Sequence, residues 1–109
     1  MEFVSDMEQC ETIEDCHKFA VMDANGEEEA AMGWLTCIEE MFSKFKRVEV
    51  LENTAILDGF DLKGLQVVAT CKSKKGKLAS VSLSSIEFLG LNENEKLWLD
   101  AVKNWNERY

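Results

Sequence analysis

Hydrophobic residues recur with a helical period in one long segment, from about residue 26 to residue 45. Their spacing of i, i+3, i+4 and i+7 places them on one face of a helix. They are Ala31, Trp34, Leu35, Ile38, Met41, Phe42 and Phe45. Asn25 precedes the segment as a candidate N-cap, with Glu28 at the third helical position as in a capping box. The pattern predicts an amphipathic helix with one buried face.

Between Val48 and Gly90 the pattern changes from a helical to an alternating period, which is typical of strands. Short runs rich in apolar and β-branched residues predict strands at 48–51, 55–57, 65–71, 78–83 and 86–89. Turns are expected at Asp58-Gly59 and at Lys74-Lys75-Gly76. Four or five short antiparallel strands of this kind form a curled sheet, or a small open barrel, that closes against helices.

The chain ends in a second amphipathic segment, which Asn92 and Glu95 introduce as a capping box. Its apolar stripe consists of Leu97, Trp98, Ala101, Val102 and Trp105. The first 20 residues are less periodic, and only 12–19 predicts a short helix there. We therefore expect an α+β fold in a single domain, 1–109, in which a small curled antiparallel sheet packs with a central amphipathic helix and a C-terminal helix.

Charge is distributed unevenly along the 109 residues, which carry a net charge of −9. Residues 1–40 contain 12 Asp and Glu and one basic residue, Lys18, whereas residues 41–109 carry a small net positive charge. Because an acidic half repels phosphate, we expect no nucleic-acid partner. Such a half suits cations, basic protein surfaces, or solubility alone.

The chain has no segment that predicts a membrane association. No apolar run approaches the roughly 18 residues that span a bilayer, and the N-terminal residues are acidic where a signal peptide is basic. We therefore expect a cytoplasmic protein.

The four cysteines include no Cys-x-x-Cys pair. Cys10, Cys16 and His17 could supply three zinc ligands, but structural zinc sites use closely spaced pairs and a fourth ligand. Free thiols in a reducing cytosol are the better interpretation, with Cys37 and Cys71 packed as small apolar residues. His17 is the one histidine, and residues adjacent in a helix do not face each other. With no Gly-rich phosphate loop either, we expect no enzymatic activity.

The carboxylates around the long helix are the best candidates for chemistry, because calcium binds oxygen-rich turns. An EF-hand loop that starts at Asp23 would need Gly and Glu where the chain has Glu28 and Trp34, so an EF-hand is excluded. Glu28 and Glu39 lie about 16 Å apart along a helix and cannot share one ion. Further ligands would have to come from elsewhere, with Asp58, Asp61, Glu93 and Glu95 as candidates. Three Glu in a first turn also stabilise a helix by roughly 0.3–1 kcal/mol each without any ligand.

The same segment carries a specific motif. It reads Val21-Met22-Asp23-Ala24, then Glu27-Glu28-Glu29-Ala30-Ala31-Met32-Gly33-Trp34, then Ile38-Glu39-Glu40. This resembles the signature of the cyanobacterial-type calcium-binding protein family (CcbP-like). The Gly-Trp pair is the distinctive part, because periodicity does not demand a glycine inside a helix.

The resemblance implies a small acidic α+β domain that binds Ca²⁺ reversibly through carboxylates outside any EF-hand. The acidic residues at matching positions are Asp23, Glu27, Glu28, Glu29, Glu39 and Glu40. The chain departs from the family where Leu35-Thr36-Cys37 replaces an aromatic run and where Val81-Ser82-Leu83 lacks a proline.

Two hypotheses follow from the sequence. The first is a small acidic cytosolic calcium-binding protein, a buffer or a sensor. The alternative is an acidic interaction protein, such as an immunity protein or inhibitor, that covers a basic protein partner with residues 1–40.

Overall fold

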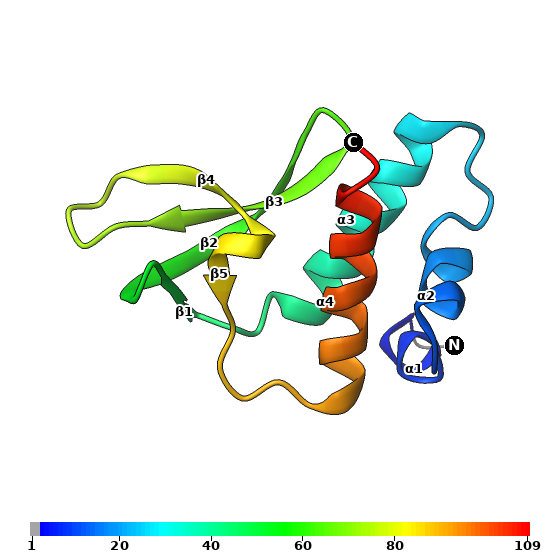
Figure 1. Ribbon diagram of the computed structural model, residues 1–109, viewed down its shortest axis with the longest axis horizontal. Coiled ribbons are helices and arrows are strands. Elements are labelled where there is room, and N and C mark those ends of the chain that lie inside the picture. The colour runs from blue at the N-terminus through cyan, green and yellow to red at the C-terminus, as the bar shows by residue number, and fades with distance from the viewer. Residues whose placement is uncertain (1–2) are drawn as a thin grey trace.

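The computed structural model describes the backbone of residues 3–109 and the side chains of residues 6–109 (Figure 1). Its helices are α1 (Phe3–Glu8), α2 (Ile13–Ala20), α3 (Glu27–Phe42) and α4 (Glu93–Asn106), with a 3-10 turn, η1, at Leu83–Ser85. Its strands are β1 (Arg47–Val50), β2 (Asn53–Lys63), β3 (Gln66–Lys72), β4 (Leu78–Ser82) and β5 (Ile86–Glu87). No helix in this part of the chain is long and apolar enough to cross a bilayer.

The strands form one sheet in the order β4-β3-β2-β1-β5, and every neighbouring pair is antiparallel. The helices gather at one end of the molecule, with α4 and α3 against the sheet and α1 and α2 beyond them (Figure 1). The predicted α+β class, with a central and a C-terminal helix, is confirmed. The sheet is open, with β4 and β5 at its edges, so it does not close into a barrel.

The second strand differs from the expectation. Residues 53–63 form one continuous strand of 11 residues, so the turn expected at Asp58-Gly59 is wrong. The pairing of β2 with β3 instead shifts between Leu57 and Gly59, which marks a β-bulge. A bulge adds one residue to a strand and bends it. The turn before β2 lies at Leu51 and Glu52, which have positive φ angles of 51° and 68°.

The two long helices begin in different ways. α4 has the expected capping box, in which Asn92 Oδ1 accepts a hydrogen bond from Glu95 N at 2.7 Å and Glu95 Oε1 accepts one from Asn92 N at 2.9 Å. α3 begins after Gly26, which has a φ of 121° and provides no side-chain cap. The capping box expected at Asn25 and Glu28 is therefore wrong. Glycine is suited to this position because a φ of 121° is unfavourable for residues that have a Cβ.

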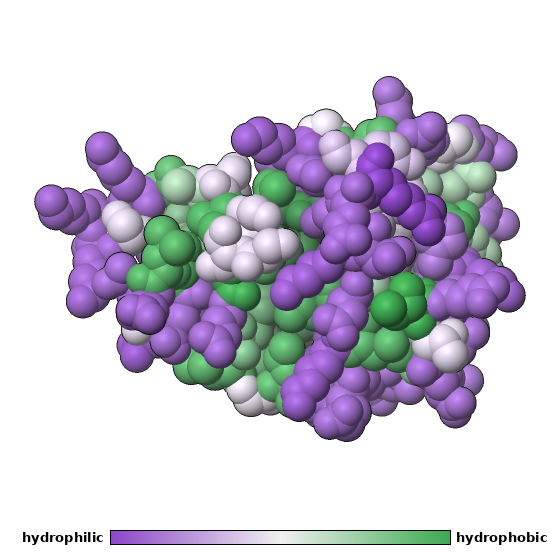
Figure 2. Space-filling model, in the orientation of Figure 1, coloured by the Kyte–Doolittle hydropathy of each residue, from purple (hydrophilic) through white to green (hydrophobic). Residues whose placement is uncertain are grey.

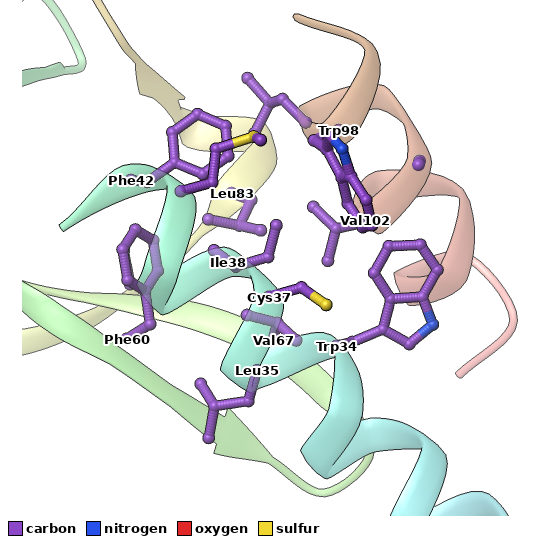
Figure 3. Close-up of a cluster of buried hydrophobic side chains, with 14 of the residues drawn as sticks. Trp34, Leu35, Cys37, Ile38, Phe42, Phe60, Val67, Leu83, Trp98 and Val102 are labelled. Atoms are coloured by element: carbon purple, nitrogen blue, oxygen red, sulfur yellow. The ribbon is translucent and has the colours of Figure 1, made fainter. Parts of the chain in front are cut away.

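The core lies between the sheet and the two long helices (Figure 3). Its largest fully buried side chains are Trp34, Trp98 and Phe42. Trp34 meets Trp98 edge-on at 5.8 Å between ring centroids and stacks on Trp105 at 6.3 Å. Aromatic groups at these separations attract each other beyond their hydrophobic burial. This cluster fixes α3 against α4 and so fixes where the acidic ends of α3 lie.

Candidate functional site

The six acidic residues singled out in the sequence are all exposed and lie at the two ends of α3. Asp23 is in the turn before the helix and has a positive φ of 65°. Glu27, Glu28 and Glu29 form the first turn of the helix. Glu39 and Glu40 lie in its last turn. Within the part of the chain that the structure describes, no three His, Cys, Asp or Glu side chains gather into a group able to hold a metal ion.

The C-terminal end of α3 brings two carboxylates to one small cavity. Glu39 and Asp58 both line a cavity of about 190 Å³ between the end of the helix and the bulge of β2. Leu57 and Phe60, three positions apart in one strand, are both buried. Strict alternation cannot bury both, because residues three apart point to opposite faces. The bulge resolves this conflict, and it is the segment of β2 that lies beside α3.

A third oxygen donor lines the same cavity. Ser43, the residue after the last helical turn, contributes to its wall. Ser43 could not be singled out from the sequence, because a serine at the end of a helix has no distinctive pattern. Asp58 was among the candidate contributors but was expected in a loop after a strand. The structure places it within β2 instead.

The other candidate contributors are engaged elsewhere. The Asp61 carboxylate accepts a hydrogen bond from the amide of Leu62 at 2.8 Å. Glu93 pairs with Lys96 at 3.7 Å. Glu95 is buried and pairs with Lys44. None of these three lines the cavity beside Glu39.

The N-terminal end of α3 is more open. Glu27 and Glu28 line a shallow depression of about 710 Å³ that α3 forms with the turn between β2 and β3, including Gly64. Glu27 also lies beside the hydroxyl of Tyr109. Partial burial, together with a hydrogen bond to Glu27 and the negative charge of Glu27, raises the pKa of the Tyr109 hydroxyl. Glu27 and Tyr109 also line one pocket, so this carboxylate of the Glu triplet lies close to the C-terminal tyrosine.

The helix dipole has opposite effects on the carboxylates at the two ends of α3. Negative charge is favoured at a helix N-terminus and disfavoured at a C-terminus. Glu27, Glu28 and Glu29 are therefore explained by helix stability alone. Glu39 and Glu40 are not, because they lie at the unfavourable end and the last turn of α3 contains no basic residue. The ion pairs among the described residues, Lys18–Glu14, Lys44–Glu95 and Lys96–Glu93, include none of the six candidates.

The cysteines and the histidine do not assemble a zinc site in the described residues. The ring of His17 packs against Trp34 and Trp105, with centroids 6.0 and 6.2 Å away. Burial, together with the nearby charge of Arg108, lowers the pKa of His17. Burial and the proximity of Cys10 raise the pKa of the Cys16 thiol to about 12. At neutral pH this thiol is protonated, and metals bind the thiolate.

The fold can be compared with solved structures. The crystal structure of Anabaena CcbP matches with a TM-score of 0.67 and 18% identity, over 89% of this chain and 93% of that one. A calcium-binding protein in its calcium-binding form matches with a TM-score of 0.68 and 19% identity, over 99% of this chain and 97% of that one. No protein-family model and no curated protein matches the chain. The chain therefore has the fold of CcbP, which confirms the expected resemblance at the level of fold.

Proposed function

We propose that this protein binds Ca²⁺ reversibly, as a buffer or a sensor, through carboxylates outside any EF-hand. The observation that carries the proposal is the cavity that Glu39 and Asp58 share at the end of α3. Support comes from the fold, which two proteins described as CcbP and as a calcium-binding protein share over nearly their whole length.

The chemistry of the cavity suits calcium better than magnesium. Ca²⁺ accepts roughly six to eight oxygen ligands in flexible geometry, whereas Mg²⁺ demands a nearly ideal octahedron and keeps several waters. Glu39 and Asp58 can each offer two carboxylate oxygens, and the hydroxyl of Ser43 adds a neutral one. Water would complete the shell. Because affinity rises with the number of charged ligands, we expect the loss of either carboxylate to weaken calcium binding.

The remaining acidic residues have a secondary role in this proposal. Glu40 adjoins Glu39 in the last turn of α3, and its charge adds to the negative potential there. Asp23 and the Glu triplet lie at the far end of the helix, where they form a separate and weaker cation-attracting surface. We keep all six as the proposed metal-binding set and place Glu39 first among them.

The proposal also includes the kind of protein and its location. We propose a non-enzymatic role for residues 1–109 as a single domain in the cytoplasm, with the calcium ion as the partner. The comparisons with known proteins give no support to the alternative of an acidic protein that binds a basic partner.

Calorimetric titration of chelator-treated protein with CaCl₂, repeated in excess MgCl₂, tests the proposal. We expect saturable binding that survives magnesium in the unmodified protein and is lost or weakened at least tenfold in Asp58→Asn and Glu39→Gln. Asp100→Asn and Glu107→Gln are matched controls, since they remove the same charges from exposed positions on α4 and just after it. Heats that match those of a neutral salt, or equal losses in all four variants, would refute a defined site.

A further inference from the structure

The sheet extends further than the helices that cover it. α3 packs on β2 and β3, and the hairpins β1–β2 and β3–β4 project beyond the helices toward the left of Figure 1. Side chains two positions apart in a strand share one face. Ala55 therefore lies on the same face as the buried Leu57, which pairs with Cys71 of β3. The face that α3 covers thus continues into a half that no helix of the described residues 3–109 covers.

A groove of about 430 Å³ lies on this continuation, hereafter the distal groove. Its floor is formed by Val50, Ala55, Cys71, Ala79 and Val81, which come from four neighbouring strands. These side chains are apolar and small, so another element can approach the sheet closely. In Figure 2, hydrophobic surface reaches this end of the molecule beside hydrophilic side chains. An exposed apolar surface with a polar rim is typical of interaction sites.

The charge of the distal groove differs in sign from that of the whole chain. Lys74, Lys75 and Lys77 line it, and none of its lining residues is acidic. The chain as a whole has 21 acidic and 12 basic residues, so a groove with lysines as its only charged residues is unusual for it. None of these lysines forms an ion pair among the described residues. The groove therefore presents apolar floor and uncompensated positive charge together.

We propose that the distal groove binds an acidic amphipathic helix of a partner protein. The apolar stripe of such a helix would cover the floor, and its flanking carboxylates would reach Lys74, Lys75 and Lys77. Helices that lay an apolar face into a groove are a common recognition mode, and complementary charge accelerates association. The covered half of the same sheet face already shows the arrangement, because α3 packs there as an amphipathic helix.

Two other occupants fit the observations less well. An anionic lipid surface is flat, whereas this site is hollow, so such a surface would leave the apolar floor of the groove uncovered. A second copy would have to bring an acidic helix, but α2, α3 and α4 bury their apolar residues in its own core, and α1 has only 6 residues. The partner helix therefore comes from a different protein.

A titration with a synthetic peptide tests the proposal. The probe is a stapled helix of about 14 residues, four turns long, with Leu on one face and Glu on its flanks. Amide resonances of ¹⁵N-labelled protein report binding and its location. We expect the largest shifts at Ala55, Ala79 and Val81, in chelator, so the result is independent of calcium. A peptide with Lys in place of Glu should bind at least tenfold more weakly.

Charge reversal at the rim gives the decisive comparison. Lys74→Glu with Lys75→Glu should weaken peptide binding at least tenfold. Lys46→Glu with Lys63→Glu changes the net charge equally, at exposed positions outside the groove, and should leave binding within about twofold. Ala79→Asp, which places a carboxylate on the floor, should also weaken it.

Several results would overturn the proposal. One is no shift at a peptide concentration of about 1 mM, and another is equal weakening by both lysine pairs. Capture of the protein by phosphatidylserine vesicles without peptide binding would indicate a lipid surface. A concentration-dependent dimer that Lys74→Glu with Lys75→Glu disrupts would indicate a second copy. Either of these two occupants, the lipid surface or the second copy, would refute the proposal of a partner helix.

Discussion

Gly33 allows two helices to approach more closely than any other residue would permit. A Cβ added at this position would lie 2.0 Å from the carbonyl oxygen of Ala20 at the end of α2. Glycine inside a helix lowers its stability by roughly 0.5–1 kcal/mol relative to Ala, so helix propensity does not explain its presence. The contact does, because it holds the end of α2 against α3.

Gly33→Ala should therefore destabilise the protein, although alanine favours helices. We expect a loss of about 1–3 kcal/mol in the free energy of unfolding, as is typical of overpacking, measured by urea denaturation. Gly59→Ala is the control, since its Cβ would lie 3.7 Å from Thr70 Oγ1, an ordinary contact. Equal stability of Gly33→Ala and the unmodified protein would mean that α2 is not held against α3.

The buried carboxylate of Glu95 depends on Lys44. Its side chain is 5% exposed, whereas that of Lys44 is 63% exposed. Burial alone would raise the pKa of Glu95, but the Lys44 ammonium and the Asn92 amide outweigh burial and hold the pKa below its usual value. Since the pKa is lower in the folded state, this stabilisation is present above the unfolded pKa and is lost as pH falls through the folded one.

Lys44→Met should consequently destabilise the protein in a pH-dependent way. We expect a loss of about 1–3 kcal/mol near neutral pH, where a buried carboxylate loses its partner. The difference from the unmodified protein should shrink as the pH falls through the lowered pKa of Glu95, below which Glu95 is protonated in both. Unfolding curves across pH 2–7 measure this. Lys96→Met removes an exposed pair with Glu93 and should change stability by less than about 1 kcal/mol.

The reactivity of the cysteine thiols tests the burial of individual residues. Burial, with smaller effects of nearby charged groups, raises the pKa of Cys16 and of Cys37 to about 12. Cys10 is half-buried. Since thiolates react and thiols do not, folded protein should react with Ellman's reagent at pH 8 slowly, and first at Cys10. Cys10→Ser should remove the fastest phase. Rapid reaction at all four cysteines would contradict the burial of Cys16, Cys37 and Cys71.

At the scale of the element, α3 carries carboxylates at both ends, and the helix dipole acts on them with opposite sign. Glu27→Gln with Glu28→Gln removes favourable charge, so metal-free protein should lose roughly 0.3–1 kcal/mol of stability per residue. Glu39→Gln with Glu40→Gln removes unfavourable charge, so metal-free protein should become more stable by a similar amount. Thermal unfolding in chelator, with and without added CaCl₂, measures both.

The same pair of variants separates helix stability from metal binding. Calcium stabilises a protein by binding its folded state, so the Glu39 and Glu40 variant should gain stability in chelator and lose the stabilisation by calcium. The Glu27 and Glu28 variant should retain most of the calcium effect. If instead the N-terminal variant alone abolishes it, the metal site lies at the other end of α3.

The elements that the sequence predicted well are those with a repeating pattern. The stripe of α3 and the capping box of α4 depend on local spacing, and both helices form close to the expected residues. β2 could not be predicted as one strand, because the bulge interrupts its alternation and Asp58-Gly59 has the composition of a turn. The three-residue spacing of Leu57 and Phe60 was the available signal for the bulge.

At the scale of the whole molecule, the candidate site was predictable only in part. The sequence identified Glu39 as acidic on a helix and Asp58 as a contributor from elsewhere. It could not bring the two together, because their meeting depends on how the bulged β2 packs beside the end of α3. Ser43 became a candidate only through that packing. The distal groove was equally hidden, since its floor comes from four strands whose register no local pattern fixes.

The charge of the whole molecule leads to a last prediction. Residues 1–40 hold 12 of the 21 acidic residues, and their mutual repulsion destabilises the compact state. The ion pairs among the described residues include two exposed ones, which contribute little. Repulsion therefore dominates, and salt shortens its range from about 30 Å at 0.01 M to about 8 Å at 0.15 M. KCl over this range should raise the free energy of unfolding, by an amount on the order of 1 kcal/mol.

Matched variants locate the repulsion. Neutralising Glu8, Glu11 and Glu29 to Gln should reduce the stabilisation by salt, because these exposed residues lie in the acidic segment. Converting Glu52, Glu87 and Asp100 to amides changes the net charge equally but outside that segment, and should leave most of the effect. Stability that falls as salt is added would mean that ion pairs outweigh repulsion. In that event the negative charge of residues 1–40 would be compensated in the folded state. Cation binding would then depend on the local arrangement of the cavity beside Glu39 and not on the net charge of the segment.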